Sequence, residues 1–364
     1  MRYQRLVGRE PSIRLERINL VVSQGGPGEV LRIQGSATAE PGAVRLSTRD
    51  ATLTPGGARA VGDMALQGNV DIESSDVAPI GSALLGSPVL SGAMKGRIEL
   101  QGTPARASAI GLVSLQPMTL SGERPTCAEP RRRQLVVDSV RMPLAATATQ
   151  LESAPVEAKV ARGTVSFRAS VGLPGTSTAT LKEITVKGME LGPVLVDYLC
   201  QPYAVTGVLE LAGEARLSPP DMLRSVEGSG RLRIGPGRVV GRDVVNLVRE
   251  VVGLGTAIAA AVRPDRPLPP TPLDFDSITA SYTIAGGVAR TDDLLYQARD
   301  VKVRAAGTYG LADGRVAMEV TLSEGANRVK GFVSGGPGSL RVVPTGVKLE
   351  DVRDIRKFLD RIFR

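Results

Sequence analysis

Side chains able to perform acid–base, nucleophilic or metal chemistry are sparse in this chain of 364 residues. It contains no histidine, which removes the commonest general base, the Ser-His and Cys-His pairs and the commonest metal ligand. No Gly-x-Ser-x-Gly elbow, Walker loop or Cys-x-x-Cys pair occurs in the sequence. The composition therefore predicts a protein that is not an enzyme and that uses no cofactor or metal.

Two pairs of adjacent acids remain as candidates for proton transfer. They are Asp292-Asp293 and Glu350-Asp351. Both pairs stand at positions where turns and helix caps commonly use acidic side chains. We therefore expect them to have structural roles.

The two cysteines, Cys127 and Cys200, are candidates for one disulfide. Cys127 lies in a loop rich in Pro and Arg, and Cys200 lies at the end of a predicted helix. An oxidising compartment would join them, whereas a reducing one would leave two ordinary thiols. We favour the disulfide slightly.

The net charge of +8 raises the question of a nucleic-acid partner. Basic and acidic residues alternate along the chain, and the only compact basic cluster is 131–133. Aromatic residues, which stack on bases, make up only 3% of the chain. We therefore predict no nucleic-acid partner. The excess charge suits either anionic lipid headgroups or an ordinary solvated surface.

Alternating apolar and polar residues, punctuated by Gly and Pro, dominate the sequence and predict many short strands. The expected strands cover 13–22, 30–37, 43–53, 64–72, 96–102, 111–120, 134–140, 156–171, 178–186, 207–213, 228–235, 278–284, 300–306, 316–322 and 331–343. Pro236-Gly237 predicts a hairpin between 228–235 and 239–240, and Gly286-Gly287 predicts another hairpin turn. The predicted fold class is mainly β with a few short helices.

Helical spacing of apolar residues follows several acid-then-apolar steps. It predicts helices over 76–85, 192–200, 243–262 and 349–363, with a weaker one over 220–226. The steps Asp76-Val77 and Glu190-Leu191 lie 114 positions apart, and matching prolines follow both. This agreement predicts an internal repeat and hence one elongated body.

The predicted organisation has two regions. Residues 1–227 form a repeat-containing β region, and 228–364 form a second region with the helix 243–262, a β-meander over 273–343 and the closing helix 349–363. Together they are expected to build an elongated, curved antiparallel sheet that forms a groove.

An alternating strand has one oily face, so the apolar positions are candidates to line that groove. Ordinary core packing under a helix is the alternative for each of them, and the more frequent fate of such residues. The candidates are Leu31, Ile33, Ile98, Leu100, Leu209, Leu211, Leu232, Ile234, Val301, Val303, Val316, Met318, Val320 and Leu322.

The run from Thr271 to Tyr296, continued from Val301 to Leu311, resembles the C-terminal region of the AsmA family. It has an apolar-aromatic strand, a Gly-Val turn, a Thr-Asp-Asp-Leu step and a strand that ends in Gly307. The hairpin and helix expected over 228–252 resemble the family as well. The motif is structural, so no catalytic residues carry over.

The resemblance implies an envelope protein of Gram-negative bacteria, similar to TamB and to bridge-like lipid-transfer proteins. Such proteins carry an N-terminal inner-membrane helix and a periplasmic β-body, and they are implicated in outer-membrane biogenesis and phospholipid transport. This chain departs from the pattern because Met1–Arg9 is short and basic, with neither a signal peptide nor a membrane span. We expect a fragment that is truncated at its N-terminus, or a gene product whose start was called late.

The expected function is to bind or conduct phospholipid acyl chains between the inner and outer membranes, in the periplasm. The alternative is a β-rich scaffold that assists outer-membrane protein assembly through contacts with an outer-membrane or periplasmic partner. The closing helix, with Val352, Ile355, Leu359 and Ile362 on one face, would dock on a membrane or partner, or would simply cap the sheet.

Overall fold

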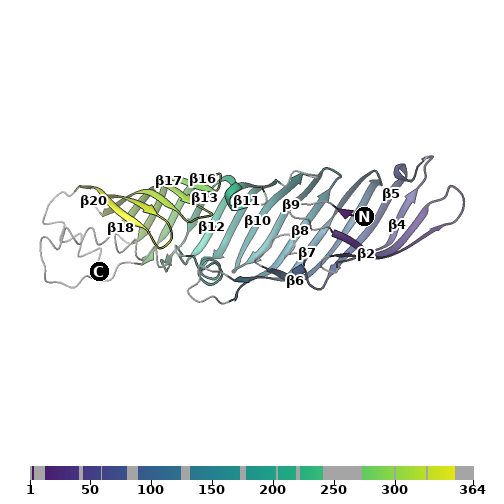
Figure 1. Ribbon diagram of the computed structural model, residues 1–364, viewed down its shortest axis with the longest axis horizontal. Coiled ribbons are helices and arrows are strands. Elements are labelled where there is room, and N and C mark those ends of the chain that lie inside the picture. The colour runs from purple at the N-terminus through teal and green to yellow at the C-terminus, as the bar shows by residue number, and fades with distance from the viewer. Residues whose placement is uncertain are drawn as a thin grey trace.

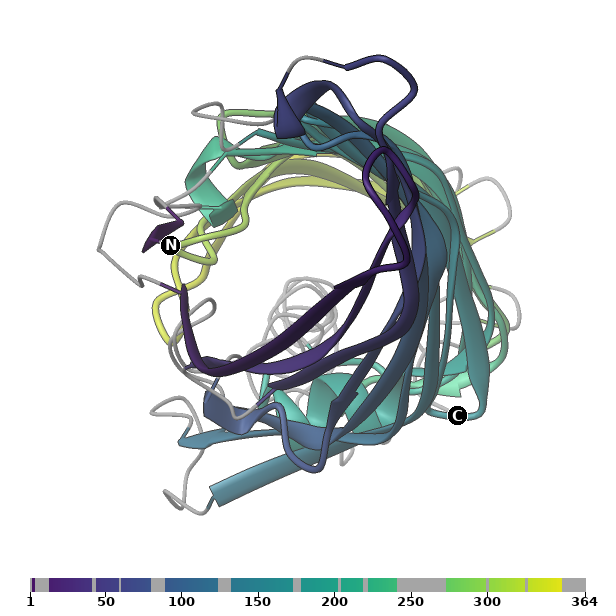
Figure 2. The ribbon, with the colours of Figure 1, turned by 90° about the vertical axis from the view of Figure 1, so that its right-hand side faces the viewer.

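The computed structural model describes residues 2–3, 13–40, 44–58, 60–79, 89–123, 132–172, 178–201, 204–218, 222–240, 273–298, 301–324 and 327–348. Most of these residues belong to one antiparallel sheet of 19 strands. Strands β2 to β5 lie near one end of an elongated molecule, and β18 to β20 lie near the other (Figure 1). Seen along its length, the sheet curves around the long axis (Figure 2).

The first half of the sheet runs from β1 to β11. Its strands are β1 (Arg2–Tyr3), β2 (Ile13–Gln24), β3 (Leu31–Glu40), β4 (Val44–Thr54), β5 (Ala65–Ser74), β6 (Val89–Thr103), β7 (Arg106–Glu123), β8 (Arg132–Ala146), β9 (Gln150–Val160), β10 (Gly163–Gly172) and β11 (Ala179–Glu190).

The second half contains β12 (Val208–Leu217), β13 (Glu227–Ile234), β16 (Ser277–Ala285), β17 (Val288–Ala298), β18 (Val301–Gly310), β19 (Val316–Glu324), β20 (Asn327–Gly335) and β21 (Arg341–Lys348). A separate two-stranded sheet joins β14 (Gly237–Arg238) to β15 (Asp274–Phe275).

Within the large sheet each strand pairs with the next one along the chain, so the topology is a meander. The sheet is open, because no pairing joins β1 to β21 among the described strands. The predicted fold class, mainly β with one long antiparallel sheet, is confirmed.

The described helical elements are short and lie between strands. They are η1 (Val61–Asp63), the π-helix η2 (Gly192–Tyr198) and α2 (Met222–Ser225). η2 covers most of the predicted helix 192–200. The predicted helix 76–85 falls largely outside the described residues, as do the helices 243–262 and 349–363.

Two local predictions were wrong. The segment 156–171 is not one strand, because Ala161 and Arg162 adopt positive φ and turn the chain between β9 and β10. Residues 237–240 do not form a hairpin with β13. Instead, β14 pairs with β15, and Val239 bridges Val205. Strand β13 pairs with β12 on one side and with β16 on the other. It therefore has no free edge with which residues 239–240 could pair.

The turn between β16 and β17 consists of Gly286 and Gly287, with φ of 55° and 74°. Positive φ at both central residues matches the hairpin geometry that glycine favours. A Cβ on Gly287 would clash with the backbone of Leu223 and Arg224 in α2, whereas a Cβ on Gly286 would meet nothing within 4 Å. The two glycines therefore differ only in their packing.

Both Gly286→Ala and Gly287→Ala are expected to destabilise the fold, but unequally. The positive φ costs each variant roughly 1 kcal/mol. The clash with α2 costs Gly287→Ala a further 1–3 kcal/mol or so. The free energy of unfolding, measured by urea denaturation, checks this ranking, and equal losses would contradict the packing of the turn against α2.

Candidate functional site

The predicted groove residues lie on one face of the sheet. Residues paired directly across an antiparallel ladder have their side chains on the same face. One such row crosses the second half of the sheet through seven consecutive strands, and its members are Leu209, Ile234, Ile278, Tyr296, Val303, Leu322 and Val329. We call the face that carries this row the apolar face.

The first half of the sheet contributes to the same face. A row of small and apolar residues leads from β6 to β12 through Leu100, Ala109, Ala146, Leu151, Val171, Ala179 and Leu217. Leu31 pairs with Leu53, Leu53 with Leu66, and Leu66 with Gly102 on β6. Gly102 lies two positions from Leu100, so Leu31 is on the same face as this row. The period of two along each strand then places all fourteen predicted residues on the apolar face.

Exposure separates these fourteen residues into two groups. Four are buried, namely Leu209, Ile234, Val301 and Leu322. The other ten are partly exposed. Leu211 and Leu232, two of these ten, pack against a core cluster, so partial exposure and core packing occur together in the set. Most of the predicted positions keep apolar surface in contact with solvent.

Parts of the apolar face are covered by segments that connect one strand to the next. Leu191, at the start of η2, is 4% exposed and packs in a cluster with Leu209, Ile234, Val239 and Phe275. The segments around β14 and β15 supply the last two. A second cluster contains Val77, 3% exposed, together with Leu115, Val140 and Val160. Leu209 and Ile234 are thus buried by crossing segments at one part of the face.

The two crossings repeat one another in detail. Val77 donates its amide to the carbonyl of Gly92 at 2.8 Å, and Leu191 donates its amide to the carbonyl of Gly207 at 2.9 Å. Both glycines adopt positive φ. Asp76 also accepts a hydrogen bond from the amide of Ala78 at 2.9 Å, as expected for an acid at a helix start. The junctions therefore match in geometry as well as in sequence.

Sequence reasoning missed several members of the apolar face. Val186 aligns with Leu211, Leu232 and Ala280 in a second row, and Tyr296 and Val329 belong to the first. Val333 is fully buried on β20. The same alternation of apolar and polar residues marked these positions in the sequence. It shows only the order along one strand, however, and not which residues lie opposite on the neighbouring strands.

Tyr296 is the most polar member of the first row. Its ring lies 5.6 Å from that of Phe275, and its hydroxyl is buried with no hydrogen-bond partner among the described residues. Burial, with smaller contributions from Asp274 and Asp276, raises the pKa of Tyr296 to about 12. The phenol is therefore neutral at physiological pH and belongs to the apolar surface.

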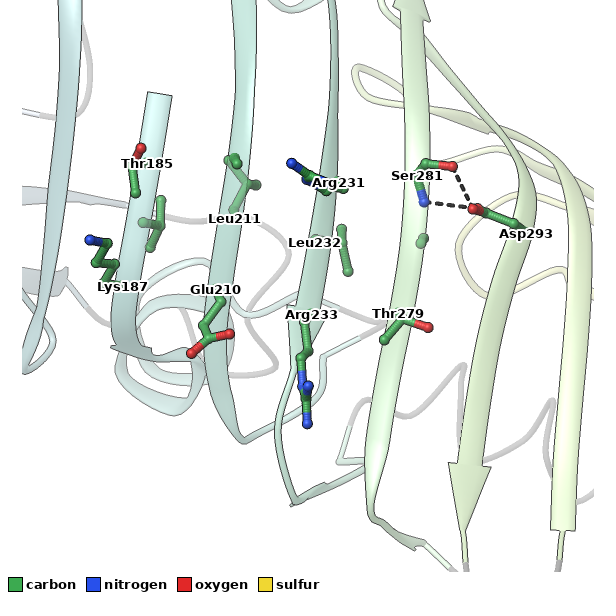
Figure 3. Close-up of a pocket in the computed structure, with 13 residues that line it drawn as sticks. Thr185, Lys187, Glu210, Leu211, Arg231, Leu232, Arg233, Thr279, Ser281 and Asp293 are labelled. Atoms are coloured by element: carbon green, nitrogen blue, oxygen red, sulfur yellow. Dashed lines mark hydrogen bonds between the residues drawn. The ribbon is translucent and has the colours of Figure 1, made fainter. Parts of the chain in front are cut away.

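The opposite face of the same strands is polar. Thr185, Lys187, Glu210, Arg231 and Arg233 alternate with the apolar row. A hollow of about 790 Å³ is lined by these residues together with members of the apolar row, among them Val186, Leu211 and Leu232 (Figure 3). Glu210 lies directly across from Arg233 in the ladder. Exposed ion pairs, such as Arg168–Glu183 at 2.8 Å, continue this pattern elsewhere. The positive charges on this face are thus interspersed with acids.

The acid pair Asp292-Asp293 has structural partners. Asp293 accepts hydrogen bonds from the hydroxyl and the amide of Ser281 on the neighbouring strand (Figure 3). The Ser281 hydroxyl is the main cause that lowers the pKa of Asp293 below its usual 3.8. Asp292 lies 3.5 Å from the guanidinium of Arg290. The other pair, Glu350-Asp351, lies outside the described residues.

Cys200 is disulfide-bonded. Cys127, the only other cysteine of the chain, lies outside the described residues, so the Cys127–Cys200 pairing stays a prediction. Within the described part of the chain, no cluster of acids and cysteines is arranged to hold a metal ion. None of the described helices has the length and apolar character needed to span a bilayer.

Ser281→Ala is expected to lower stability at neutral pH by less than about 1 kcal/mol, because the pair is exposed to solvent. The lowered pKa of folded Asp293 means that the bond stabilises the fold above about pH 3.8, and that this contribution is lost as the pH falls through the folded-state pKa. Thermal unfolding of both proteins across this range checks the sign. The difference in stability between Ser281→Ala and the parent should shrink as the pH falls. Thr279→Ala, on the same strand and face, should show no such dependence on pH.

The predicted disulfide is checked by mapping peptides without reduction. One cross-linked peptide should contain both Cys127 and Cys200, and it should separate on reduction. Reduction is also expected to lower the free energy of unfolding by about 2–4 kcal/mol, because the bond closes a long loop in the unfolded chain. Peptides that pair cysteines of two different molecules would contradict the assignment.

No family model, curated protein or solved structure matches this chain. The case for its function therefore depends on the apolar face, its exposure and its continuity.

Proposed function

We propose that this protein is a non-enzymatic, AsmA-like envelope protein that carries phospholipid acyl chains along its apolar face. The observation that carries the proposal is the set of fourteen apolar residues on one face of one open sheet, ten of them partly exposed. A soluble monomer normally buries such a surface. A bound hydrocarbon chain would cover it.

The size of the face supports lipid as the ligand. Nineteen strands at about 4.8 Å spacing extend roughly 85 Å in the hydrogen-bonding direction. That length exceeds the hydrocarbon thickness of a whole bilayer, about 30 Å, so several acyl chains would fit in series. Each methylene shielded from water contributes about 0.8 kcal/mol, without any directional contact.

The curvature of the sheet supports the same reading. In the end-on view, η2 lies on the inner side of the curved sheet (Figure 2). η2 packs against the apolar face through Leu191 and Leu195. A concave apolar face would shelter acyl chains and leave headgroups at the rim.

The disulfide at Cys200 supports an oxidising location. We therefore place the protein in the periplasm and infer an association with the inner membrane. A membrane contact would come from an N-terminal anchor or from the closing helix 349–363. The resemblance to the AsmA family favours the same compartment.

A scaffold that assists outer-membrane protein assembly is the second candidate. The observation that favours it is the β2 edge, where backbone groups from Leu15 to Gln24 have no ladder partner among the described strands. An extended partner would bind along that edge and not across the apolar face. The two candidates therefore predict different sites of binding.

Leu211→Glu tests lipid carriage against Ala212→Glu. The two residues are neighbours on β12 and both are partly exposed, but only Leu211 lies on the apolar face. The purified parent protein should retain phospholipid detectable by mass spectrometry. A charge at Leu211 would lie against the acyl chains and should reduce retained lipid several-fold, whereas Ala212→Glu should retain the parental amount.

Circular dichroism would establish that both variants keep the β fold. A stronger variant, Leu211→Glu combined with Leu232→Glu, places two charges on neighbouring strands of the same row. If the parent retains no phospholipid from lipid-rich extracts, or if both single variants lose it equally, lipid carriage by the apolar face is wrong.

A further inference from the structure

One part of the polar face departs from the mixture of acids and bases found elsewhere on it. It lies on β18, β19 and β20, near one end of the molecule (Figure 1). In two neighbouring rows of the ladder, a hydroxyl on β19 lies between basic residues on β18 and β20. The first row is Lys302, Ser323 and Arg328, and the second is Arg304, Thr321 and Lys330. We call these six residues the basic block.

The four basic side chains of the block are exposed to solvent. Strands lie about 4.8 Å apart and alternate residues of a strand about 6.8 Å apart, so the Cα atoms of the four stand at the corners of a rectangle of about 10 by 7 Å. None of the four forms an ion pair with another described residue, unlike Arg168 with Glu183. Like charges this close repel one another, so the block favours an anionic partner.

Two exposed apolar side chains adjoin the basic block on the same face. Phe332 follows Lys330 by two positions on β20, and Val343 on β21 pairs with Phe332. They are 37% and 53% exposed. One acid, Glu319, borders the block opposite Phe332. A soluble anion would contact only the charges, whereas a membrane offers phosphate groups to the cations and an apolar layer beneath them to the ring.

We propose that this part of the polar face docks on the surface of an anionic phospholipid bilayer. The four cations face the headgroups, and Phe332 and Val343 enter the layer just below them. β18, β19 and β20 each pair with a strand on both sides, so the surface does not depend on a free edge.

Docking through the basic block leaves the apolar face free. Val303 and Leu322 alternate with the block residues on β18 and β19, and they belong to the opposite face of the sheet. The protein would therefore contact a bilayer with one face and keep the other available. This inference goes beyond lipid carriage and does not require it.

Sedimentation with vesicles tests the docking on the full chain. The parent should bind phosphatidylcholine vesicles that contain one third phosphatidylglycerol at least about tenfold more tightly than pure phosphatidylcholine vesicles. Each basic residue near an anionic surface strengthens binding roughly fivefold, so Arg328→Gln combined with Lys330→Gln should weaken it on the order of 20-fold. The matched control is Arg231→Gln combined with Arg233→Gln, which removes two exposed charges at the same spacing from the polar face of β13 and should bind like the parent.

A second comparison separates a membrane from a soluble anion. Phe332→Thr keeps every charge and a residue suited to strands, and it should weaken binding to the anionic vesicles several-fold. Val136→Thr is the control, because Val136 is exposed, at 50%, on the polar face of the distant strand β8. Inorganic phosphate should not displace the parent from the vesicles at an equal concentration of phosphate groups.

The comparison of the two kinds of vesicle needs no variant. Equal binding of the parent to both, equal weakening by the two double variants, unchanged binding of Phe332→Thr, or displacement by inorganic phosphate would overturn the proposal. Leu211→Glu, which alters only the apolar face, should bind anionic vesicles like the parent. A parent that retains phospholipid but does not bind anionic vesicles would overturn the docking and leave lipid carriage intact.

Discussion

The structure depends on the cross-strand register of apolar residues. In a sheet of a single layer, a slip of one residue would move every side chain of a strand to the opposite face. The apolar face stays continuous because directly paired residues match from strand to strand, as Leu209, Ile234 and Ile278 do. Stability, curvature and any ligand surface all follow from that match.

The register is maintained through several irregularities. On β11, Leu181 and Ile184 both pair with apolar-face positions of β12 although they are three residues apart. Glu183, with φ of 53°, takes up the extra residue between them. A β-bulge of this kind bends the strand and increases its twist. The same device therefore keeps the apolar face in phase and contributes to the curvature of the sheet.

Among the described residues, crossing segments cover only some of the apolar face. At each of the junctions Val77 and Leu191, a buried side chain lies on the face and its amide donates a hydrogen bond to a glycine carbonyl. Between them the apolar rows stay partly exposed. The polar face needs no cover, because its acids and bases pair in solvent.

The sequence by itself determined the class of structure and the side to which each candidate points. Alternation with period two is a local property, so Leu211 and Leu232 were assigned to one face from their own strands. The matching steps at Asp76 and Glu190 were also visible, since they are local signals of a turn and a cap.

Only the tertiary structure decided which strands pair and which residues are covered. Val239 could not be placed from its neighbours because its partner, Val205, is distant in sequence. The burial of Leu209 and Ile234, and the partial burial of Leu211 and Leu232 beside them, likewise depend on crossing segments around Leu191 and Phe275. Alternation specifies the face of a side chain, whereas the packing of distant segments determines whether that side chain meets protein or solvent.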